Sequence, residues 1–320
     1  MSLPASSIPD LPLTHPGLDV TQPFRTRAAL AAGISAKELR GPRFRTVFRG
    51  VHVSNSVRAT DLQRIRGALL LFEAGTAWAS HESAARVLGV PVPDQSDVHI
   101  SVPHASMRRR RAELKCHVSP GGRVVEHQGM HVSSPHQLFV ELACRLGLVD
   151  LVIVGDHLVR QRMTTPRKLV QHCRATTQPH ARAALRAARL VRSGVDSPME
   201  TRLRLLLVLA GLPEPEVNLS LCTRDGDVFR KYDLSYPGIK VVIEYDGRHH
   251  IEREQQWHAD LLRREDSEGN DWRFVVVIAA DIFTTPAQTI NRVWRILRDR
   301  GLADLPARPS QEWRTHFAGR

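Results

Sequence analysis

The sequence predicts a mixed α/β protein, of the α+β class, with three folded parts. Segments with helical spacing and short β-branched runs follow one another along most of the 320 residues. The last third has the order α-β-β-β-α-β-α, in which a meander of three strands is followed by a helix and a fully apolar strand. Because such a strand is typical of a buried parallel position, we expect a mixed sheet flanked by helices. A chain of this length is sufficient for two or three separate cores.

Two short helices are predicted after a lead-in. Residues 1–23 are rich in Pro, Ser and Thr, and we expect them to be mobile. The first folded part, residues 24–58, begins with a helix from Ala28 to Ala32 that a glycine ends. Ser35 then has the chemistry of an N-cap for a second helix, AKEL, which Gly41-Pro42 ends.

A basic hairpin is predicted next, where RFRTVFRGVHV alternates apolar and basic residues around Gly50. Two short helices and such a hairpin are typical of a winged helix-turn-helix, whose second helix enters the major groove of DNA. On that interpretation three arginines of the hairpin would contact phosphates, namely Arg43, Arg45 and Arg49. A small α/β element with a solvated basic edge has the same pattern, so both interpretations stay open.

The sequence of residues 59–195 predicts a basic α/β middle segment that is helical in its second half. DLQRIRGALLLFEAG and SHESAARVLGV have helical spacing, whereas VHISVP, ELKCHVS and the runs on either side of Gly129 are short strands. The loop between two of these strands contains four adjacent arginines, Arg108, Arg109, Arg110 and Arg111. Adjacent positive charges repel one another unless they are solvated or face a polyanion, and both readings remain open here.

The last predicted part covers residues 196–302, with a tail over residues 303–320. Ser197 and Pro198 have the N-cap and first-turn chemistry of a helix that continues to Ala210. The runs EVNLSLC, VFRKYDLSY and IKVVIEYD then predict three strands. The remaining elements are a charged helix over about 252–266, the apolar strand FVVVIA and a final helix over about 286–300.

The net charge of +12 is concentrated in the first part of the chain. Residues 1–195 contain 27 Lys and Arg against 13 Asp and Glu, whereas residues 196–320 contain 18 against 20. Such asymmetry indicates a polyanionic partner, and nucleic acid is the usual one. Arginine greatly outnumbers lysine, which a genome of high GC content also produces, so the charge has a second explanation.

Cysteine spacing and hydropathy indicate a cytoplasmic protein without a membrane anchor. Cys116, Cys144, Cys173 and Cys222 lie far apart and form no C-x-x-C pair, which is typical of reduced thiols. The N-terminus has no basic and apolar regions of a secretory signal. The longest apolar runs are interrupted by charged residues and are too short to cross a bilayer.

Acidic residues converge at the end of the predicted C-terminal sheet. Pro237-Gly238 is a turn signal, and a turn centred there places Asp233 opposite Val242 and Lys231 opposite Glu244. Asp246 shares that face, because side chains alternate with a period of two. Glu200 would add a fourth acid if its helix packs on the sheet. Clustered carboxylates repel unless they are protonated or bind a hard cation such as Mg²⁺ or Mn²⁺.

These residues carry a resemblance to a known enzyme superfamily. Asp233, the run EYDGRHH, the run DLLRR and the run WRF before an apolar strand resemble the Vsr-like branch of the PD-(D/E)xK nucleases. Within that branch the similarity is greatest to a domain family of unknown function, and it covers about residues 196–302. The N-terminal helices, hairpin and SHESAARVLGV are similar to AbiEi-type antitoxins. The resemblance implies a restriction-endonuclease-like mixed sheet flanked by helices.

What the resemblance implies is metal-dependent cleavage of phosphodiester bonds in double-stranded DNA. Asp233 and Glu244 would bind Mg²⁺ or Mn²⁺, with help from Asp246 and Glu200, and the ion would lower the pKa of a bound water. His250, or its neighbour His249, would be the general acid or base. The phosphate would be held by arginines, namely Arg248, Arg263 and Arg264.

One position departs from the pattern of the superfamily. Asp246 stands where these nucleases usually have a lysine, and Lys231 or a histidine would have to replace the missing amine. The alternative function is a catalytically inactive DNA-binding regulator or antitoxin that retains the nuclease fold. Besides DNA, the candidate partners are a second copy of the chain and a toxin-type protein, and no membrane is expected.

Overall fold

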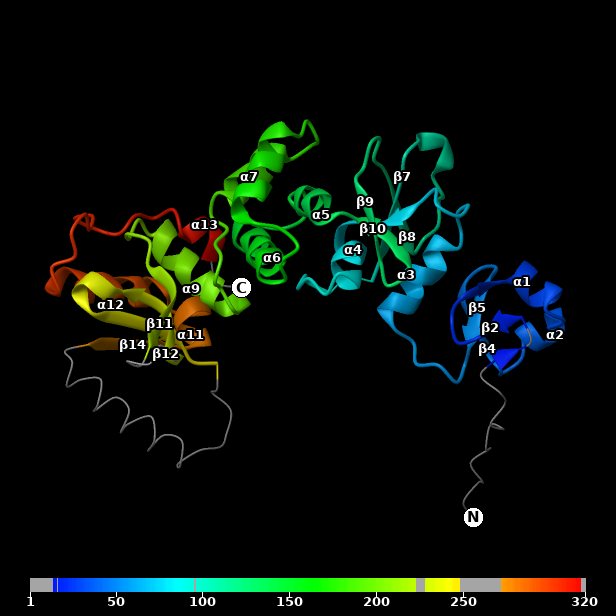
Figure 1. The fold of residues 1–320 in the computed structure, drawn as a ribbon, viewed down its shortest axis with the longest axis horizontal. Coiled ribbons are helices and arrows are strands. Elements are labelled where there is room, and N and C mark those ends of the chain that lie inside the picture. Colours follow the sequence, from blue (N-terminus) through cyan, green and yellow to red (C-terminus); the bar gives the residue numbers. More distant parts are fainter. Residues whose placement is uncertain (1–13, 16, 95, 223–227, 248–271, 318–320) are drawn as a thin grey trace, which may run out of the picture. The chain divides into compact units, whose positions relative to one another are not determined.

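The computed structural model describes residues 14–15, 17–94, 96–222, 228–247 and 272–317 (Figure 1). It has a mixed α/β fold with both parallel and antiparallel strand pairs, as predicted. The chain divides into two compact units, residues 1–141 and residues 142–320. Across the described ranges, every helix is too short or too polar to cross a membrane.

The first part of unit 1 confirms the predicted helices and hairpin. Its elements are β1 (Thr14–His15), β2 (Leu18–Asp19), β3 (Phe24–Arg25), α1 (Thr26–Ala31), α2 (Ala36–Leu39), β4 (Phe44–Phe48) and β5 (Val51–Ser54). The Ser35 hydroxyl accepts a hydrogen bond from Glu38 N, and the Glu38 carboxylate accepts one from Ser35 N, which completes a capping box. Strands β3, β5 and β4 pair antiparallel in that order.

Part of the lead-in predicted over residues 1–23 is folded, and residues 1–13 lie outside the described residues. Val20 is buried with Phe24 and Phe44 in one hydrophobic cluster, and Leu18 packs against it. The rings of Phe24 and Phe44 meet edge to face with centroids 5.6 Å apart. Because residues 1–23 are rich in Pro and Thr overall, their composition did not indicate the short apolar segment that contributes to this small core.

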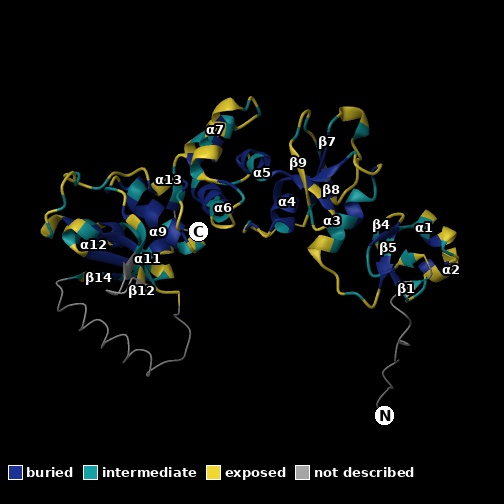
Figure 2. Cartoon of the chain, in the orientation of Figure 1, coloured by how far each residue is buried: buried dark blue, intermediate teal, exposed yellow. Residues whose placement is uncertain are grey.

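The second part of unit 1 is a five-stranded sheet with helices packed against it. Its strands are β6 (Trp78–Ala79), β7 (Val98–Val102), β8 (Leu114–Val118), β9 (Val124–His127) and β10 (Met130–Ser133), in the order β8-β7-β6-β10-β9. The helical elements are α3 (Asp61–Leu69), α4 (His81–Val87), the 3₁₀ turn Ala105–Met107 and α5 (Pro135–Leu142). Helix α4 contacts β7 and β10 and is almost entirely buried, as its dark blue colour in Figure 2 shows.

Unit 2 begins with helices that the sequence assigned to the middle segment. These are α6 (Leu148–Arg160), α7 (Pro166–Ala175) and α8 (Ala181–Ala188), followed by α9 (Pro198–Leu209). A buried polar network explains why they belong to the C-terminal part. Arg204 on α9 is 0% exposed and donates to Asp156 on α6 at 2.9 Å, and Thr201 donates to the same carboxylate. A domain boundary at residue 195 would separate Asp156 from Thr201 and Arg204.

The sheet of unit 2 has the predicted meander and a parallel final strand. It contains β11 (Glu216–Cys222), β12 (Val228–Tyr236), β13 (Val241–Tyr245) and β14 (Arg273–Val277), in that order. Strands β11, β12 and β13 pair antiparallel, and β13 pairs with β14 in parallel. Helix α9 contacts β12 and β13. The charged helix predicted over 252–266 lies outside the described residues.

The predicted tail is part of the folded unit. After α11 (Ala279–Phe283) and α12 (Pro286–Asp299), the chain continues to α13 (Arg314–Phe317). Ser310 N donates to Ala210 O at 2.8 Å, and the Ser310 hydroxyl donates to Leu209 O, so this segment covers the end of α9. Trp313 and Phe317 are each only 6% exposed. Two isolated aromatic residues give no periodic signal, which is why the sequence predicted a tail.

Candidate active site

The register of β12 and β13 brings Asp233 and Glu244 together. Leu234 pairs with Ile243 and Ser235 pairs with Val242. The same register continued by one residue places Asp233 directly opposite Glu244. The prediction that Asp233 lies opposite Val242 was wrong by two residues, because the connection is a 3₁₀ turn from Pro237 to Ile239 followed by Lys240 at φ 54°. The turn is centred later than its Pro-Gly pair suggested.

Asp233 is a half-buried carboxyl group with an elevated pKa. Its Oδ2 accepts a hydrogen bond from Tyr245 N at 2.9 Å. Burial raises the pKa of the Asp233 carboxyl to about 6, and nearby carboxylates add to the shift. These carboxylates belong to Glu200, Glu244 and Asp196. The acids therefore lie close enough to influence one another's protonation, as the clustered pattern predicted.

Helix α9 supplies the acid that approaches from the side of the sheet. Ser197 caps α9 by accepting from Glu200 N at 3.2 Å, which fixes the first turn. The Glu200 side chain is buried, and its Oε2 accepts from Asp196 N at 2.9 Å. Asn218 on β11 lies 3.5 Å from the same oxygen. Glu200 is also one of the carboxylates that raise the pKa of Asp233, and its role as a metal ligand stays a prediction.

Lys231 does not pair with Glu244 as the predicted register required. Its ammonium group forms an ion pair with Asp196, and both side chains are about half exposed, at 43% and 52%. Asp196 is a member of the acidic group that the sequence analysis missed. Its position four residues before Glu200, at the N-terminal side of a capped helix, was the available signal. The register places Asp246, rather than Glu244, in line with Lys231.

The acids are spread more widely than the ligands of one bound ion. Within the described ranges, the one group with three potential ligand atoms within 4.8 Å of one another consists of His81, His99 and His117 in unit 1. For the carboxylates of Asp233, Glu200 and Glu244 to share an ion, their side chains would have to rotate inward. Glu200 and Asp233 are currently held by backbone N–H groups instead.

Several predicted site residues lie outside the described residues. They are Arg248, His250, Arg263 and Arg264, together with His249. Asp246 is described and exposed, and its backbone N–H donates to Val277 O at 2.8 Å on the neighbouring strand. The described half of the site is therefore an acidic patch formed by α9, β12 and β13.

The three hairpin arginines have different environments. Arg45 is half-buried, and its guanidinium donates to Ser54 O, Val57 O and Gln63 Oε1. Because these bonds fix the loop after β5, they favour a structural role for Arg45 over the predicted phosphate contact. Arg43 lies over the Phe44 ring with its guanidinium carbon 5.2 Å from the centroid. Arg49 is exposed beside Gly50 at the hairpin turn.

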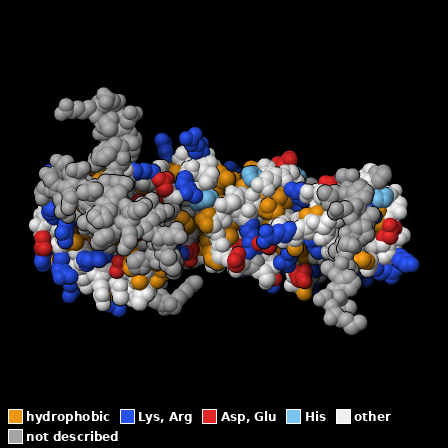
Figure 3. Space-filling view, turned by 90° about the horizontal axis from the view of Figure 1, so that it is seen from below, with side chains coloured by type: hydrophobic (Ala, Val, Ile, Leu, Met, Phe, Trp, Pro, Cys, Tyr) orange, Lys and Arg blue, Asp and Glu red, His pale blue; other side chains and the backbone are white. Residues whose placement is uncertain are grey.

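The four-arginine loop of unit 1 is exposed, as predicted. Arg108 donates to Cys116 O at 3.2 Å, and Arg111 forms an isolated bridge with Leu114. Together with Lys115 and His117 the loop lines a hollow of about 530 Å³. In the view of Figure 3 the blue Lys and Arg side chains form several separate groups on the surface.

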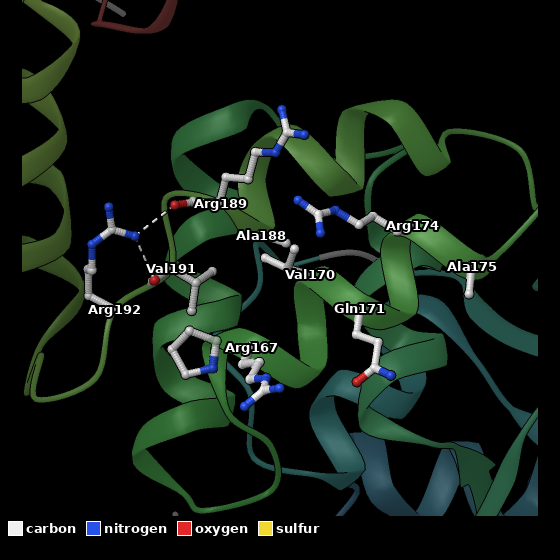
Figure 4. A pocket seen from close by; sticks show the side chains of 10 residues that line it. Arg167, Val170, Gln171, Arg174, Ala175, Ala188, Arg189, Val191 and Arg192 are labelled. Carbon is white, nitrogen blue, oxygen red and sulfur yellow. Dashed lines mark hydrogen bonds between the residues drawn. The ribbon is translucent and has the colours of Figure 1, made fainter.

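A second arginine-lined hollow lies between α7 and α8 of unit 2, and the sequence did not predict it. Its volume is about 580 Å³, and four arginines line it: Arg167, Arg174, Arg189 and Arg192 (Figure 4). In Figure 4 the side chains of Arg174 and Arg189 lie on one side of Val170 and Ala188, with Arg167 on the other. Arg192 is held by the carbonyls of Arg189 and Val191 and pairs with Glu214.

A third hollow is lined by residues that neighbour those of the second hollow in sequence, and its lining includes a member of the acidic group. It has a volume of about 420 Å³ and is lined by Arg160, Arg162, Thr165, Ser193 and Asp196, among others. Thr165 precedes Pro166, and Ser193 follows Arg192, so the linings of the two hollows share neighbouring residues. The lining of this hollow thus contains both arginines of the α6 end and Asp196 of the acidic group.

Comparisons with known proteins give distant relatives. No family model matches the chain. Two proteins of Mycobacterium tuberculosis, the uncharacterized proteins MT2308 and Rv2248, are each 25% identical over 248 residues, which is 74% of this chain and 87% of theirs. The crystal structure of the Rv2827c protein from the same species matches with a TM-score of 0.38 and 16% identity, over 57% of this chain and 75% of that one. The chain is therefore similar to mycobacterial proteins whose names state no activity.

Proposed function

We propose that the chain is a DNA-binding endonuclease that uses Mg²⁺ or Mn²⁺ to hydrolyse phosphodiester bonds. The observation that carries the proposal is the half-buried Asp233 on β12, whose carboxyl lies near enough to Glu244 and Glu200 for their charges to add to the rise in its pKa that burial causes. Acids from a capped helix, the middle strand of a meander and the next strand approach one another at one end of a mixed sheet. That order of elements also agrees with the resemblance to the Vsr-like PD-(D/E)xK nucleases.

The chemistry follows from the charge of the patch. Asp233, Glu200 and Glu244 supply oxygen ligands, which select hard divalent cations. A bound ion would offset the burial and the repulsion that together raise the pKa of Asp233, and it would lower the pKa of a bound water that attacks phosphorus. His250 and the arginines Arg248, Arg263 and Arg264 stay predicted as the acid–base and phosphate-binding groups.

The arginine-lined hollow of α7 and α8 supports a nucleic-acid substrate. Arg167, Arg174 and Arg189 are exposed, and a phosphate backbone is attracted to such a group without regard to base sequence. A further hollow lined by Arg160 and Arg162 includes Asp196, so positive charge also lies beside a member of the acidic group. Double-stranded DNA is the proposed substrate.

A second candidate function is a DNA-binding regulator or antitoxin that retains this fold without cleavage. Two observations favour it. Lys231 pairs with Asp196 rather than with the strand acids, and the carboxylates lie further apart than ligands of a single ion. In such a protein the patch would bind no cation, and the arginines alone would account for DNA binding.

Conversion of supercoiled plasmid to the nicked form distinguishes these functions. We expect the purified full-length chain to nick plasmid in Mn²⁺ or Mg²⁺ and to stop when a chelator is added. Asp233→Asn and Glu244→Gln should abolish nicking while DNA binding in a gel-shift assay is retained. Glu216→Gln is the matched control, because Glu216 is an exposed acid on β11 of the same sheet.

Two results would decide against the nuclease. Nicking that survives both substitutions, or that persists in chelator, places the activity outside the acidic patch. Binding of DNA without nicking under any divalent cation supports the regulator instead.

A further inference from the structure

Three histidines from separate elements of unit 1 lie close together at the start of α4. His81 begins α4, His99 lies on β7 and His117 lies on β8. One ring nitrogen from each lies within 4.8 Å of one from each of the others. His81 is 8% and His99 1% exposed, whereas His117 is half-buried. The ring of His117 stacks on those of His81 and His99, with centroids 3.9 Å and 5.2 Å apart.

The fold holds these rings in place with backbone contacts on each element. His81 has a positive φ of 50°, a conformation that is costly for a non-glycine residue and persists only where its surroundings fix it. Glu141 fixes this backbone conformation, because its carboxylate accepts a hydrogen bond from His81 N at 3.0 Å. Ser83 on α4 accepts from His99 N at 2.9 Å, which joins α4 to β7. In the parallel pair of β7 and β8, Ser101 lies opposite His117, so His99 and His117 share one face.

Carboxylates face the outer nitrogens of two of the rings. His99 Nδ1 lies 3.0 Å from His117 Nε2, while His99 Nε2 lies 3.6 Å from Glu82 Oε2. His81 Nδ1 lies 3.1 Å from Ser80 Oγ and 3.9 Å from Glu141 Oε2. Glu82 is fully buried and Glu141 is 8% exposed. Metal-binding histidines characteristically donate their second ring N–H to such a carboxylate, which fixes the tautomer.

We propose that His81, His99 and His117 form a binding site for a transition-metal ion of the zinc type. Imidazole nitrogens suit Zn²⁺, Co²⁺, Ni²⁺ or Cu²⁺ rather than Mg²⁺, so this site differs in chemistry from the acidic patch of unit 2. Tetrahedral zinc with bonds of about 2.0–2.1 Å needs nitrogens roughly 3.3 Å apart. His99 Nδ1 and His117 Nε2 lie 3.0 Å apart, which is close to that spacing. Ring nitrogens of the three histidines lie within 4.8 Å of one another, and the His81 ring would turn out of its stack on His117 to complete the coordination.

A divalent ion also balances the charge of this interior. Glu82 and Glu141 are buried acids beside the three imidazoles, and Glu141 also accepts hydrogen bonds from Ser133 and Gln137. A buried negative charge is costly unless a cation compensates it. His117 additionally lines the hollow beside the four-arginine loop, so this ring is in contact with the surface of the unit. The competing account is a chain of hydrogen bonds through Glu82, His99 and His117 with no ion.

Cobalt is the probe that distinguishes these accounts. The full-length chain, stripped with chelator, should bind one equivalent of Co²⁺ with the visible absorption bands of a tetrahedral nitrogen-rich site, and Zn²⁺ should displace it. His117→Gln should abolish the bands and weaken Zn²⁺ binding by at least about 100-fold, because one of three protein ligands is lost. Glu82→Gln should weaken binding by about 10–100-fold, the usual effect of removing an outer carboxylate.

Two control variants locate the ion. His131→Gln changes an exposed histidine on β10 of the same sheet and should leave the cobalt spectrum unchanged. Glu244→Gln disrupts the acidic patch and should also leave it unchanged, so failure of the nuclease proposal does not affect this test. If His117→Gln fails to fold by circular dichroism, His81→Gln is measured in its place. Absence of tetrahedral bands in the folded wild type, or bands that persist in the folded His variants, overturns the proposal.

Discussion

Asp233 on β12 lies near Glu244 on the neighbouring strand and near Glu200 on α9, and burial together with the charges of both acids raises its pKa. The sequence predicted that these acids belong together, because period-two alternation and a Pro-Gly turn signal were sufficient to place them on one face. It did not predict their partners. The four-residue connection shifted the register by two, and the ion pair between Lys231 and Asp196 depends on where α9 packs, which local spacing does not encode.

The raised pKa of Asp233 predicts a pH-dependent stability. The folded-state pKa of about 6 exceeds the ordinary value of 3.8, so the stabilising contribution is present below about pH 4 and is lost as pH rises through 6. Without divalent cations, Asp233→Asn should therefore unfold at higher urea concentration than the wild type at pH 8, and at a similar concentration at pH 4. Mg²⁺ should raise the wild-type midpoint at pH 8 and leave that of the variant unchanged. A wild type that is the more stable at pH 8 in chelator would contradict this.

Helices, strands and their caps were mostly predictable at the scale of elements. Serine caps, a glycine stop and alternating hairpin residues each produce a local sequence signal, and Ser35 and Ser197 cap the helices expected of them. Two features were not predictable in this way. The segment around Trp313 packs onto α9 through long-range contacts, and the pairing of Arg204 with Asp156 joins helices 48 residues apart in sequence.

The buried pair of Arg204 and Asp156 predicts a large effect of single substitution. Arg204→Met leaves Asp156, which is 3% exposed, without its compensating charge and should cost about 3–5 kcal/mol of unfolding free energy. Arg202→Met is the control, because Arg202 pairs with Asp150 nearer the surface, where loss costs about 0–1 kcal/mol. Chemical denaturation measures both. Similar losses in the two variants would refute the assigned network.

Trp313 tests whether the C-terminal segment is part of the fold. Its side chain is 6% exposed, and truncation of a buried tryptophan usually costs about 3–5 kcal/mol. We expect Trp313→Ala to lower the unfolding midpoint in guanidinium chloride by a corresponding amount. An unfolding midpoint equal to that of the wild type within experimental error would instead indicate that residues 303–320 form a tail outside the fold.

At the scale of the whole molecule, the excess of positive charge indicated a polyanionic partner, but composition could not locate the contact surface. The division of the chain at residue 141 places the arginine-rich helices α7 and α8 in the same unit as the acidic patch. Because helical spacing alone does not tell which sheet a helix packs against, the sequence assigned these helices to the preceding segment.

On the proposed function, this location predicts which arginines would contact DNA. Arg174→Ala combined with Arg189→Ala should weaken binding and lower the dependence of log affinity on log salt by about 2, one unit for each lost phosphate contact. Arg295→Ala, an exposed arginine on α12, is the matched control and should change neither quantity. If the dependence of log affinity on log salt is the same in the double variant and the wild type, the hollow of α7 and α8 does not contact DNA.

The most direct test of the proposed nuclease is the rate of plasmid nicking at saturating DNA and Mn²⁺, compared between the wild type and Asp233→Asn. Loss of a metal ligand removes several kcal/mol of transition-state stabilisation, so the account predicts a rate lower by at least about 100-fold at equal DNA occupancy. Equal rates in the two proteins, or no nicking by the wild type, would contradict it.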